Sequence, residues 1–597
     1  AYRMTAPRVA LVAILLAAMA REAVSQATPR GATDAGAAGT LGSGARYTPP
    51  PGRRPARFPA EWRFPAGRAP VVAKRAMVVS DAPLASQAGV EILKRGGNAV
   101  DAAVATAFAL AVVYPEAGNI GGGGYMVIHL ANGRNAAIDY REVAPLAATR
   151  DMYVGPDGKV TDASVVGPLA SGVPGAVAGL TEALARHGKL PLAEVMKPAI
   201  RLAEEGFVVD SALARRFGDY RELLQQFGGG AVFVPNGEPL GPGARLAQPA
   251  LARTLHAIAT RGRAGFYDGP IAESWTRELA ALGGIITLED LRRYRAVWRK
   301  PIRSTYRGHT LLTMPPSSSG GVTMVETLNI LEGFRTLPPF GSTRWAHLLG
   351  SAFQRAFVDR NAKLGDPAFV DVPLKELTDK RYAASLRATI GAERATPTPA
   401  APLREGTQTT HVSVADSRGN AVAMTTTIND LFGSGVYLPS AGFFLNDEMD
   451  DFTSRPGVPN MYGLVQGEAN AIQPGKRMLS AMSPTIVLDA RGRVLLVAGS
   501  RGGPRIITST TGVLLNVIDY RMTLADALSA PRLHHQALPD TLRIEENGIT
   551  TAVNDSLRAM GYGTSTGSIG QVNALMRVPG GFEGVADPRG SGRPVGY

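Results

Sequence analysis

The segment from 407 to 429 is the part of the chain whose residue types come closest to a catalytic apparatus. Polar and apolar residues alternate over 411–415, and a second run rich in Thr and Val covers 421–429. Alternation with a period of two is typical of half-buried strands. The loop between the runs includes Gly419, which suits a type I turn closed by a left-handed glycine. The sequence therefore predicts a β-hairpin.

The register of that hairpin decides which side chains lie together. If the turn pairs Asp416 with Asn420, Thr409 lies opposite Thr427. Three polar side chains then share one face, namely those of Thr425, Thr427 and Asn429. One interpretation is a strand with threonines on its solvent side, which is the ordinary use of this pattern. The other is a nucleophile with its hydrogen-bonding supports.

A threonine hydroxyl needs a base before it can act as a nucleophile. One solution is cleavage of the chain just before the threonine, so that its own α-amine becomes the base. An α-amine titrates near ~7.7–8.0, which suits general-base work at neutral pH. The bond that such a cleavage would break is the Gln408–Thr409 peptide.

Four further motifs follow the hairpin at long, specific spacings. They are Leu445–Phe452 (LNDEMDDF), Pro456–Gly463 (PGVPNMYG), Leu479–Thr485 (LSAMSPT) and Gly499–Gly503 (GSRGG). With Thr409-Thr410-His411 at the head, their order closely resembles the γ-glutamyltransferases of the N-terminal-nucleophile hydrolase superfamily. The resemblance extends from about Met77 to Tyr597. It implies a four-layer αββα sandwich of the α/β (α+β) class, made by one precursor that cuts itself into two chains.

The resemblance also implies a role for individual residues in γ-glutamyl transfer. Thr409 is the expected nucleophile and Thr427 its hydroxyl partner. Backbone amides at a helix start can stabilise an anion, and Gly502 and Gly503 are the expected oxyanion hole. A planar guanidinium suits a carboxylate. The expected substrate-binding residues are Arg141 and Ser480 for the α-carboxylate, and Asp451, Asn429 and Glu448 for the α-ammonium.

The expected reaction follows from these roles. The resemblance implies an acyl-enzyme on Thr409, formed from glutathione or another γ-glutamyl compound. This acyl group would then pass to water, to an amino acid or to a dipeptide. No cofactor and no metal ion are expected, because the oxyanion hole and the α-amine supply the chemistry.

Two features concern the shape of the expected site. Family members usually carry two serines where this chain has Ser480-Ala481. Loss of one hydroxyl from a carboxylate site costs about 1.5–3 kcal/mol of binding free energy, which would weaken glutamyl specificity or shift it to other acyl groups. The loop 456–471, with Tyr462, resembles a lid that covers the site. Its composition alone is equally consistent with a solvated loop.

Periodicity and capping predict the elements that must position these residues. Helices are expected to begin at Ser80-Asp81-Ala82-Pro83, with a side-chain cap, and after Asn98. The glycine-rich run 118–124, before strands at 125–130 and 136–140, is interpreted as backbone packed too closely for side chains. A second hairpin at 483–499 repeats the D-x-R-G turn. Further helices are predicted over 176–187, 192–205, 251–260, 271–282, 322–332 and 504–517, and 370–408 is read as a long open connection.

Composition excludes several classes of function. The 597 residues include no cysteine, which removes disulfides, thiolate catalysis and cysteine-ligated metals. The net charge is +13, but residues 1–75 alone hold twelve basic and three acidic residues. Since the excess charge belongs to the leading segment and not to a binding face, nucleic-acid binding is not expected.

The N-terminal segment predicts export. Arg3 and Arg8 precede an apolar run over 9–20, which is shorter than the ~20 residues needed to span a bilayer. We expect a signal peptide at 1–27 and a periplasmic or secreted protein without a stable membrane span, in preference to a retained anchor.

The rest of the chain divides into three expected parts. Residues 28–75 are a linker rich in Ala, Gly, Pro and Arg. The expected subunits are 76–408 (large) and 409–597 (small), which form a heterodimer around one core.

The histidines are a weaker signal. His411 lies close to Thr409 and resembles a base of the Ser/His type, but the family pattern makes it structural. His534 and His535 are adjacent, so they point apart on a strand or turn, and no zinc-site spacing accompanies them.

Two other functions remain open. One is an acylase of the same superfamily with glutaryl or cephalosporin specificity. Ala481 favours it, whereas Arg141 and Asp451 argue against it, because an acyl group without an α-amine needs no Asp451. The other is a non-catalytic binding protein of the cell envelope, which would remain a single uncut chain.

Overall fold

The computed structural model describes residues 50–65, 68–398 and 409–597. The predicted signal peptide, the first part of the predicted linker and Gln408 lie outside the described residues. Contacts divide the chain into two units, Ala1–Thr48 and Pro49–Tyr597, and every described residue belongs to the second.

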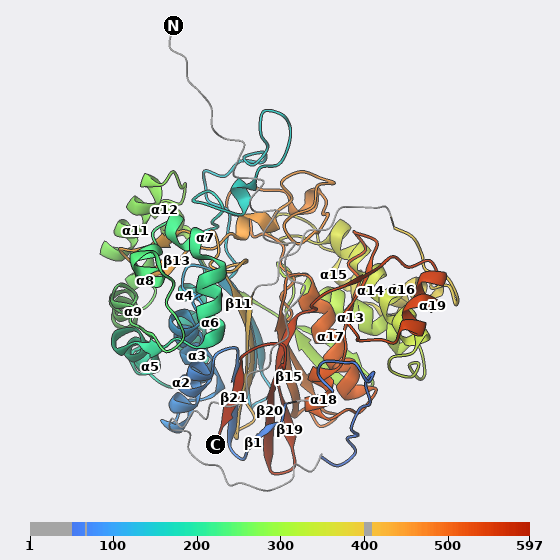
Figure 1. The fold of residues 1–597 in the computed structure, drawn as a ribbon. Coiled ribbons are helices and arrows are strands. Elements are labelled where there is room, and N and C mark those ends of the chain that lie inside the picture. Colours follow the sequence, from blue (N-terminus) through green and yellow to red (C-terminus); the bar gives the residue numbers. More distant parts are fainter. Residues whose placement is uncertain (1–49, 66–67, 399–408) are drawn as a thin grey trace. The chain divides into compact units, whose positions relative to one another are not determined.

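Two antiparallel seven-stranded sheets form the centre of the second unit (Figure 1). The first sheet has the order β1 (Val71–Ala73), β20 (Gly581–Ala586), β19 (Gln571–Val578), β15 (Val494–Arg501), β14 (Thr485–Leu488), β9 (His309–Thr313) and β8 (Ile302–Tyr306). The second has the order β21 (Arg593–Gly596), β2 (Ala76–Ser80), β10 (Thr410–Asp416), β11 (Ala421–Thr427), β3 (Gly123–His129), β4 (Asn135–Asp139) and β7 (Val297–Arg299).

Strand alternation explains why each sheet is covered on both faces. Val412 and Val414 of β10 pack into a core with helices, whereas Ala415 belongs to a separate core between the sheets. Residues of both sheets meet in that central core, among them Val79 of β2 and Val497 of β15. Every residue of β10 and β11 is buried. Two faces of each sheet are therefore removed from water, as in a four-layer sandwich.

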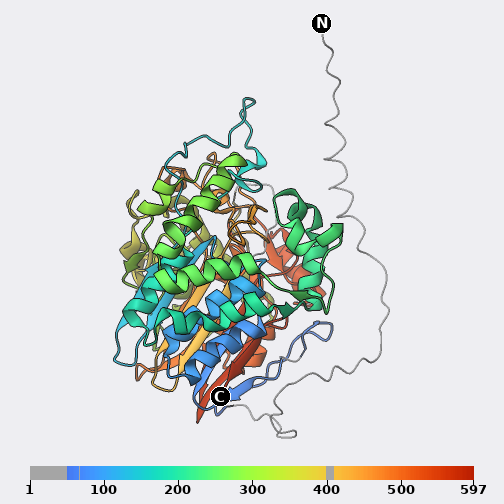
Figure 2. The same ribbon diagram turned by 90° about the vertical axis from the view of Figure 1, so that its left-hand side faces the viewer.

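Helices form the two outer layers. The layer on the second sheet includes α2 (Pro83–Lys94), α3 (Ala99–Val113), α4 (Ala176–His187), α5 (Leu192–Glu205), α9 (Pro249–Arg261) and α11 (Pro270–Ala281). Figure 2 shows helices of this layer, in blue and green, in front of the strands. The layer on the first sheet includes α13 (Gly320–Glu332), α14 (Thr343–Lys363), α17 (Arg505–Ile518), α18 (Leu524–Ser529) and α19 (Thr551–Ala559). The predicted αββα class is confirmed, and the predicted helices match within two residues at each end.

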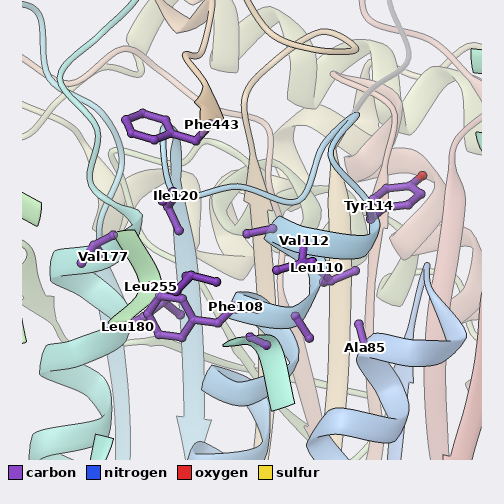
Figure 3. Packing of buried hydrophobic residues seen from close by; sticks show 14 of the residues in the cluster. Ala85, Phe108, Leu110, Val112, Tyr114, Ile120, Val177, Leu180, Leu255 and Phe443 are labelled. Atoms are coloured by element: carbon purple, nitrogen blue, oxygen red, sulfur yellow. The ribbon is translucent and has the colours of Figure 1, made fainter. Parts of the chain in front are cut away.

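The α3 helix is buried along its whole length, which explains its nearly uniform apolar composition. Its Phe108 and Leu110 lie among side chains of neighbouring helices, such as Leu180 of α4 and Leu255 of α9 (Figure 3). No other part of the described chain contains a helix that is both long and apolar enough to cross a bilayer, and α3 itself is too short.

One of the two predicted helix caps is confirmed. The Asn98 side chain accepts hydrogen bonds from the amides of Val100 and Asp101, and Asp101 accepts one from the amide of Asn98 at 2.7 Å. This reciprocal pair satisfies amides that a helix start leaves without intrahelical partners.

The cap predicted at Ser80-Asp81 is wrong. Ala82 occupies the cap position of α2 and makes no side-chain cap bond. Asp81 instead accepts from the Thr410 hydroxyl at 2.8 Å and from the side-chain amide of Gln571. Tertiary partners thus outcompete the local cap, and Asp81 anchors the residue that follows Thr409.

The register predicted for the first hairpin is confirmed. Thr410 faces Thr426 and Ala415 faces Ala421, which is the pairing that sets Thr409 against Thr427. The second hairpin, β14–β15, belongs to the other sheet, so the two D-x-R-G hairpins lie in opposite layers. The glycine run is also as expected: a Cβ on Gly122 would lie 2.1 Å from the carbonyl oxygen of Thr427.

The open connection predicted over 370–408 is partly wrong. It contains the helices α15 (Leu374–Leu377) and α16 (Lys380–Ala388). Asp379 caps α16 by accepting from the amide of Arg381 at 2.6 Å. Only Ala383 of α16 is fully buried, so the apolar periodicity of this exposed helix is too sparse to predict it.

Both sheets combine strands that precede Thr409 with strands that follow it. In the first sheet, the strands β14, β15, β19 and β20 follow Thr409 in sequence and lie between outer strands that precede it. In the second sheet, β10 and β11 lie between β2 and β3, and the edge strand β21 also follows Thr409. The centre of each sheet therefore comes from the part of the chain after 409.

Candidate active site

The hydroxyl groups of Thr409 and Thr427 lie together at the end of the first hairpin. The Thr409 hydroxyl donates to the Thr427 hydroxyl oxygen at 3.4 Å, and Thr427 accepts from the amide of Asn429 at 2.8 Å. All three residues are buried. The register of β10 and β11 produces this pair, and the threonines do not form the solvent face that the alternative interpretation required.

The loop 456–471 reaches the cavity of the hydroxyl pair through Tyr462. The Tyr462 hydroxyl donates to the side-chain oxygen of Asn429 at 2.7 Å, and its ring is buried. Asn429 has a φ of 76°, a left-handed conformation that asparagine tolerates better than most residues. The loop is therefore packed against Asn429 at Tyr462, whereas residues 455–458 are exposed, so the lid stays a prediction.

Gly502 and Gly503 connect β15 to α17, next to Tyr462. Their φ values are 124° and 56°, both unfavourable for other residues. A Cβ on Gly503 would lie 2.6 Å from Cδ1 of Tyr462, so this position also lacks space for a side chain. The turn places backbone at the start of α17 along the cavity that contains Thr409. Amides in this position favour a developing negative charge.

Arg141 lies just after β4 and is held by its backbone. Its amide donates to Asp139 at 3.1 Å, and its carbonyl oxygen accepts from the Tyr294 hydroxyl at 2.8 Å. The guanidinium is buried and contacts Glu448 at 2.6 Å and the carboxylate of Asp451.

Three buried carboxyl groups surround this one guanidinium, since Glu142 also lies 3.5 Å from it. Burial raises the pKa of Glu142 to about 7, although Arg141 opposes the shift. Burial likewise raises the pKa values of Glu448 and Asp451. Burial lowers the pKa of Arg141, but Glu448, Glu142 and Asp451 together raise it above its ordinary value. With all three carboxyl groups ionised, the cluster would carry excess negative charge, and an added cation would favour that ionised form.

Ser480 and Ala481 form another wall of the cavity. The Ser480 hydroxyl oxygen accepts from the amide of Met482 at 3.1 Å, and the Ser480 carbonyl oxygen accepts from the amide of Ser319 at 2.8 Å. Ala481 contributes a methyl group and belongs to the apolar core of the α13–α14–α17 layer. The wall therefore offers one side-chain hydroxyl and not two.

One cavity brings together most of the residues predicted from the sequence. Its lining includes Thr409, Thr427, Asn429, Arg141, Asp451, Tyr462, Ser480 and Gly503. Two predicted residues lie just behind this lining: Glu448 contacts Arg141, and Gly502 precedes Gly503 in the turn.

Arg360 of α14 also lines this cavity, and the sequence analysis did not predict it. It is 1% exposed. A single arginine inside a helix of mixed composition has no motif that marks it, so only the packing of α14 against the cavity shows its place.

The three histidines considered in the sequence, His411, His534 and His535, have partners other than the Thr409–Thr427 pair. The two ring nitrogens of His411 lie 2.8 Å from the Thr425 hydroxyl and 3.1 Å from the Ser413 hydroxyl. Burial lowers the pKa of His411 to about 3, so the ring is neutral. His534 contacts Thr508, while His535 faces Asp540. Within the described part of the chain, no group of three or more acidic or histidine side chains is arranged to hold a metal ion.

Comparison with known proteins identifies the family. The model of the family described as gamma-glutamyltranspeptidase matches residues 85–597. This chain belongs to the gamma-glutamyltranspeptidase family. It is thus an enzyme of the γ-glutamyltransferase and glutathione hydrolase type, with the N-terminal-nucleophile hydrolase fold.

Relatives of this gamma-glutamyltranspeptidase family member cover most of its length. A glutathione hydrolase proenzyme of Pseudomonas sp. (strain A14) is 48% identical over 506 residues, 83% of this chain and 88% of that protein. One of Escherichia coli (strain K12) is 47% identical over 532 residues, covering 87% and 91%. The crystal structure of a cephalosporin acylase from Bacillus halodurans superposes with a TM-score of 0.79 at 29% identity, covering 90% of this chain and 99% of that one.

Proposed function

We propose that this protein is a self-processing γ-glutamyltransferase and hydrolase in which Thr409 carries the acyl group. The donors are glutathione and related γ-glutamyl compounds, and the acceptors are amino acids, dipeptides or water. One observation carries the proposal: a single cavity joins a buried hydroxyl pair to a buried ion pair of opposite charges, Arg141 and Asp451.

The ion pair explains how a γ-glutamyl donor would be recognised. The α-carbon of the donor bears an ammonium and a carboxylate, and Arg141 and Asp451 are their complements. A donor that enters would exchange the internal ion pair for two external ones, so neither buried charge is left alone. Glu142 and Glu448, which also contact Arg141, add carboxyl groups that favour the ammonium when they are ionised.

Chemistry would proceed at the hydroxyl pair. The Thr409 oxygen attacks the γ-carbonyl carbon while its proton passes to the α-amine of the cleaved chain. The amides of Gly502 and Gly503 stabilise the tetrahedral oxyanion. The C–N bond of the donor then breaks, the leaving amine takes the proton, and an ester on Thr409 remains. Water or an acceptor amine attacks this ester, gives its proton to the α-amine and restores Thr409.

The same hydroxyl would mature the precursor. Attack of Thr409 on the carbonyl carbon of Gln408 converts the peptide into an ester, and water hydrolyses the ester. The products are a large chain that ends at Gln408 and a small chain that begins at Thr409, joined as a heterodimer. The N-terminal apolar run supports export to the periplasm or the medium before or during this step.

A second candidate, an acylase for glutaryl or cephalosporin side chains, has specific support. The structural similarity to the cephalosporin acylase and the methyl group at Ala481 both favour it. Asp451 opposes it, because a glutaryl group has no ammonium to neutralise that carboxylate. Turnover of γ-glutamyl and glutaryl 4-nitroanilides by the same preparation separates the two functions.

The decisive experiment compares the masses of wild type and Thr409→Ala under denaturing conditions. We expect two fragments from the wild type, divided between Gln408 and Thr409, and one intact chain from the variant. Activity of the variant should fall at least ~10⁴-fold, as for other lost nucleophiles.

Thr426→Val is the matched control. In the wild type, the Thr426 hydroxyl donates to the carbonyl oxygen of Gly123 at 2.8 Å, and Thr426 is not part of the cavity lining. The variant should therefore still be cut. An uncut wild-type chain that binds γ-glutamyl peptides without turnover would support the binding-protein alternative instead.

A further inference from the structure

Arg360 is a second buried cation in the cavity of Thr409. Its Nε donates to the Ser319 hydroxyl oxygen at 3.0 Å, and its Nη1 donates to side-chain oxygens of Asn361 at 2.9 Å and Gln466 at 3.2 Å. Its Nη2 is buried and has no hydrogen-bond partner among the described residues. A buried donor without a partner carries a desolvation cost that a ligand atom would relieve.

The charge of Arg360 is also uncompensated. All three hydrogen-bond partners are neutral groups. The carboxylate that acts on it is Asp451, which is already paired with Arg141. Burial lowers the pKa of Arg360 to about 10, so it remains protonated at neutral pH. The cavity thus presents a cation for which the described residues provide no counter-ion of its own.

The position of Arg360 indicates which part of a ligand it would meet. The Ser319 hydroxyl that accepts from Arg360 donates to the carbonyl oxygen of Ser480 at 2.5 Å, so Arg360 is fixed beside the Ser480 wall. The neighbouring Ala481 has no hydroxyl. Arg360, Ser480 and Ala481 thus line the same cavity, and one buried guanidinium N–H of Arg360 has no partner among the described residues.

We propose that Arg360 binds the α-carboxylate of the acyl donor together with Arg141 and Ser480, and so determines specificity for donors that carry this carboxylate. The inference rests on the proposed function and deepens it. A carboxylate has two oxygens and about four acceptor sites, enough for Arg141, Arg360 and one hydroxyl. When the donor's ammonium pairs with Asp451, its carboxylate accepts hydrogen bonds from both arginines, while Arg141 keeps its contact with Glu448.

Three 4-nitroanilide donors test this assignment. The γ-glutamyl donor carries both α-groups, the glutaryl donor keeps the carboxylate without the amine, and the 4-aminobutanoyl donor keeps the amine without the carboxylate. In Arg360→Gln we expect kcat/KM to fall roughly 10- to 100-fold for the first two donors, mainly through KM, as for a lost hydrogen bond to a charged group. The value for the 4-aminobutanoyl donor should change less than about twofold. Arg360→Lys should restore part of the loss.

Arg355→Gln is the matched control on the same helix. Arg355 is buried and donates to the carbonyl oxygen of Ser351 at 3.1 Å, but it is not part of the cavity lining. It should leave the ratios among the three donors unchanged. Equal losses for all three donors in Arg360→Gln or Arg360→Lys would overturn the proposal and make Arg360 a purely structural residue.

Failure of the inference can be distinguished from failure of the proposed function. A wild type that hydrolyses the glutaryl donor but not the γ-glutamyl donor refutes the proposed function. The ratio of glutaryl to 4-aminobutanoyl turnover in Arg360→Lys would still decide the role of Arg360. Self-cleavage and thermal unfolding of each variant show whether it has folded.

Discussion

The two ends of the active-site cavity use different physical means. At one end, Thr409 and Thr427 are neutral groups, fixed by strand register and by hydrogen bonds of 2.8–3.4 Å. At the other end, Arg141 is surrounded by buried carboxyl groups whose pKa values are displaced from their ordinary range. The difference suggests that recognition depends on the balance of buried charge and that reaction depends on the placement of neutral groups.

The two ends also differ in which elements carry them. The hydroxyl end belongs to two adjacent strands in the middle of a sheet, where the backbone ladder fixes every position. The charged end is assembled from the loop after β4 and the short 3₁₀ helix Glu448–Asp451. Apart from the nucleophile itself, loss of one charged partner should therefore have a larger effect than loss of a supporting hydroxyl such as that of Thr427.

Among the variants that test this difference between the two ends, Arg141→Gln should have the largest effect on activity and stability. It leaves the carboxyl groups of Glu142, Glu448 and Asp451 without their common cation, and breaking a buried ion pair costs about 3–5 kcal/mol. We expect kcat/KM for a γ-glutamyl donor to fall roughly 10²- to 10³-fold and the midpoint of thermal unfolding to drop. Arg150→Gln, which removes a partly exposed partner of Glu468, should change neither quantity appreciably.

Ala481→Ser should strengthen substrate binding at the charged end. A hydroxyl beside Ser480 adds a donor for the α-carboxylate, and the lower end of the range for such bonds, about 1.5 kcal/mol, corresponds to a roughly tenfold lower KM. Steady-state kinetics with γ-glutamyl and 4-aminobutanoyl donors check the result. A similar gain for the donor without a carboxylate would show that the hydroxyl acts elsewhere.

Thr427→Val should act on the hydroxyl end with a smaller effect. The substitution keeps the shape but removes the acceptor for Thr409 and for the amide of Asn429. We expect kcat to fall about five- to tenfold with KM nearly unchanged, the scale of a neutral hydrogen bond. If KM rises while kcat stays constant, Thr427 would belong to substrate binding instead.

The smallest effect should be a pH dependence specific to the charged end. Because the pKa of Glu142 is raised to about 7, this carboxyl group takes up a proton as the pH falls from 8 to 6. The cluster then loses negative charge and holds an ammonium less well. The inhibition constant of L-glutamate should therefore rise about threefold over this interval, an order-of-magnitude figure for one screened charge. Glu142→Gln should flatten the profile, and a profile unchanged by this substitution would contradict the assignment.

The sequence predicts the hydroxyl end better than the charged end, and the reason is local geometry. The turn around Gly419 determines the register, and the register places Thr409 against Thr427. Similarly, Asn98 and Asp101 are three residues apart, so their cap depends on local residues alone.

Features that depend on distant partners could not be predicted. Asp81 leaves its expected cap because Thr410 and Gln571 approach it from strands more than 300 residues away in sequence. Arg360 reaches the cavity only through the packing of α14. The Arg141–Glu448 contact joins a loop to a short helix, and no spacing rule relates them.

The division of both sheets at position 409 has a consequence for the life of the mature protein. If the chain is cut before Thr409, as we propose, no peptide bond joins the central strands to the neighbouring strands that precede Thr409. The folded particle keeps both fragments, since each sheet contains strands from each. The unfolded protein does not keep them, because its two fragments diffuse apart. The rate at which they associate again then depends on their concentration. After maturation, unfolding would no longer be readily reversible, and the lifetime of the folded protein would depend on its rate of unfolding.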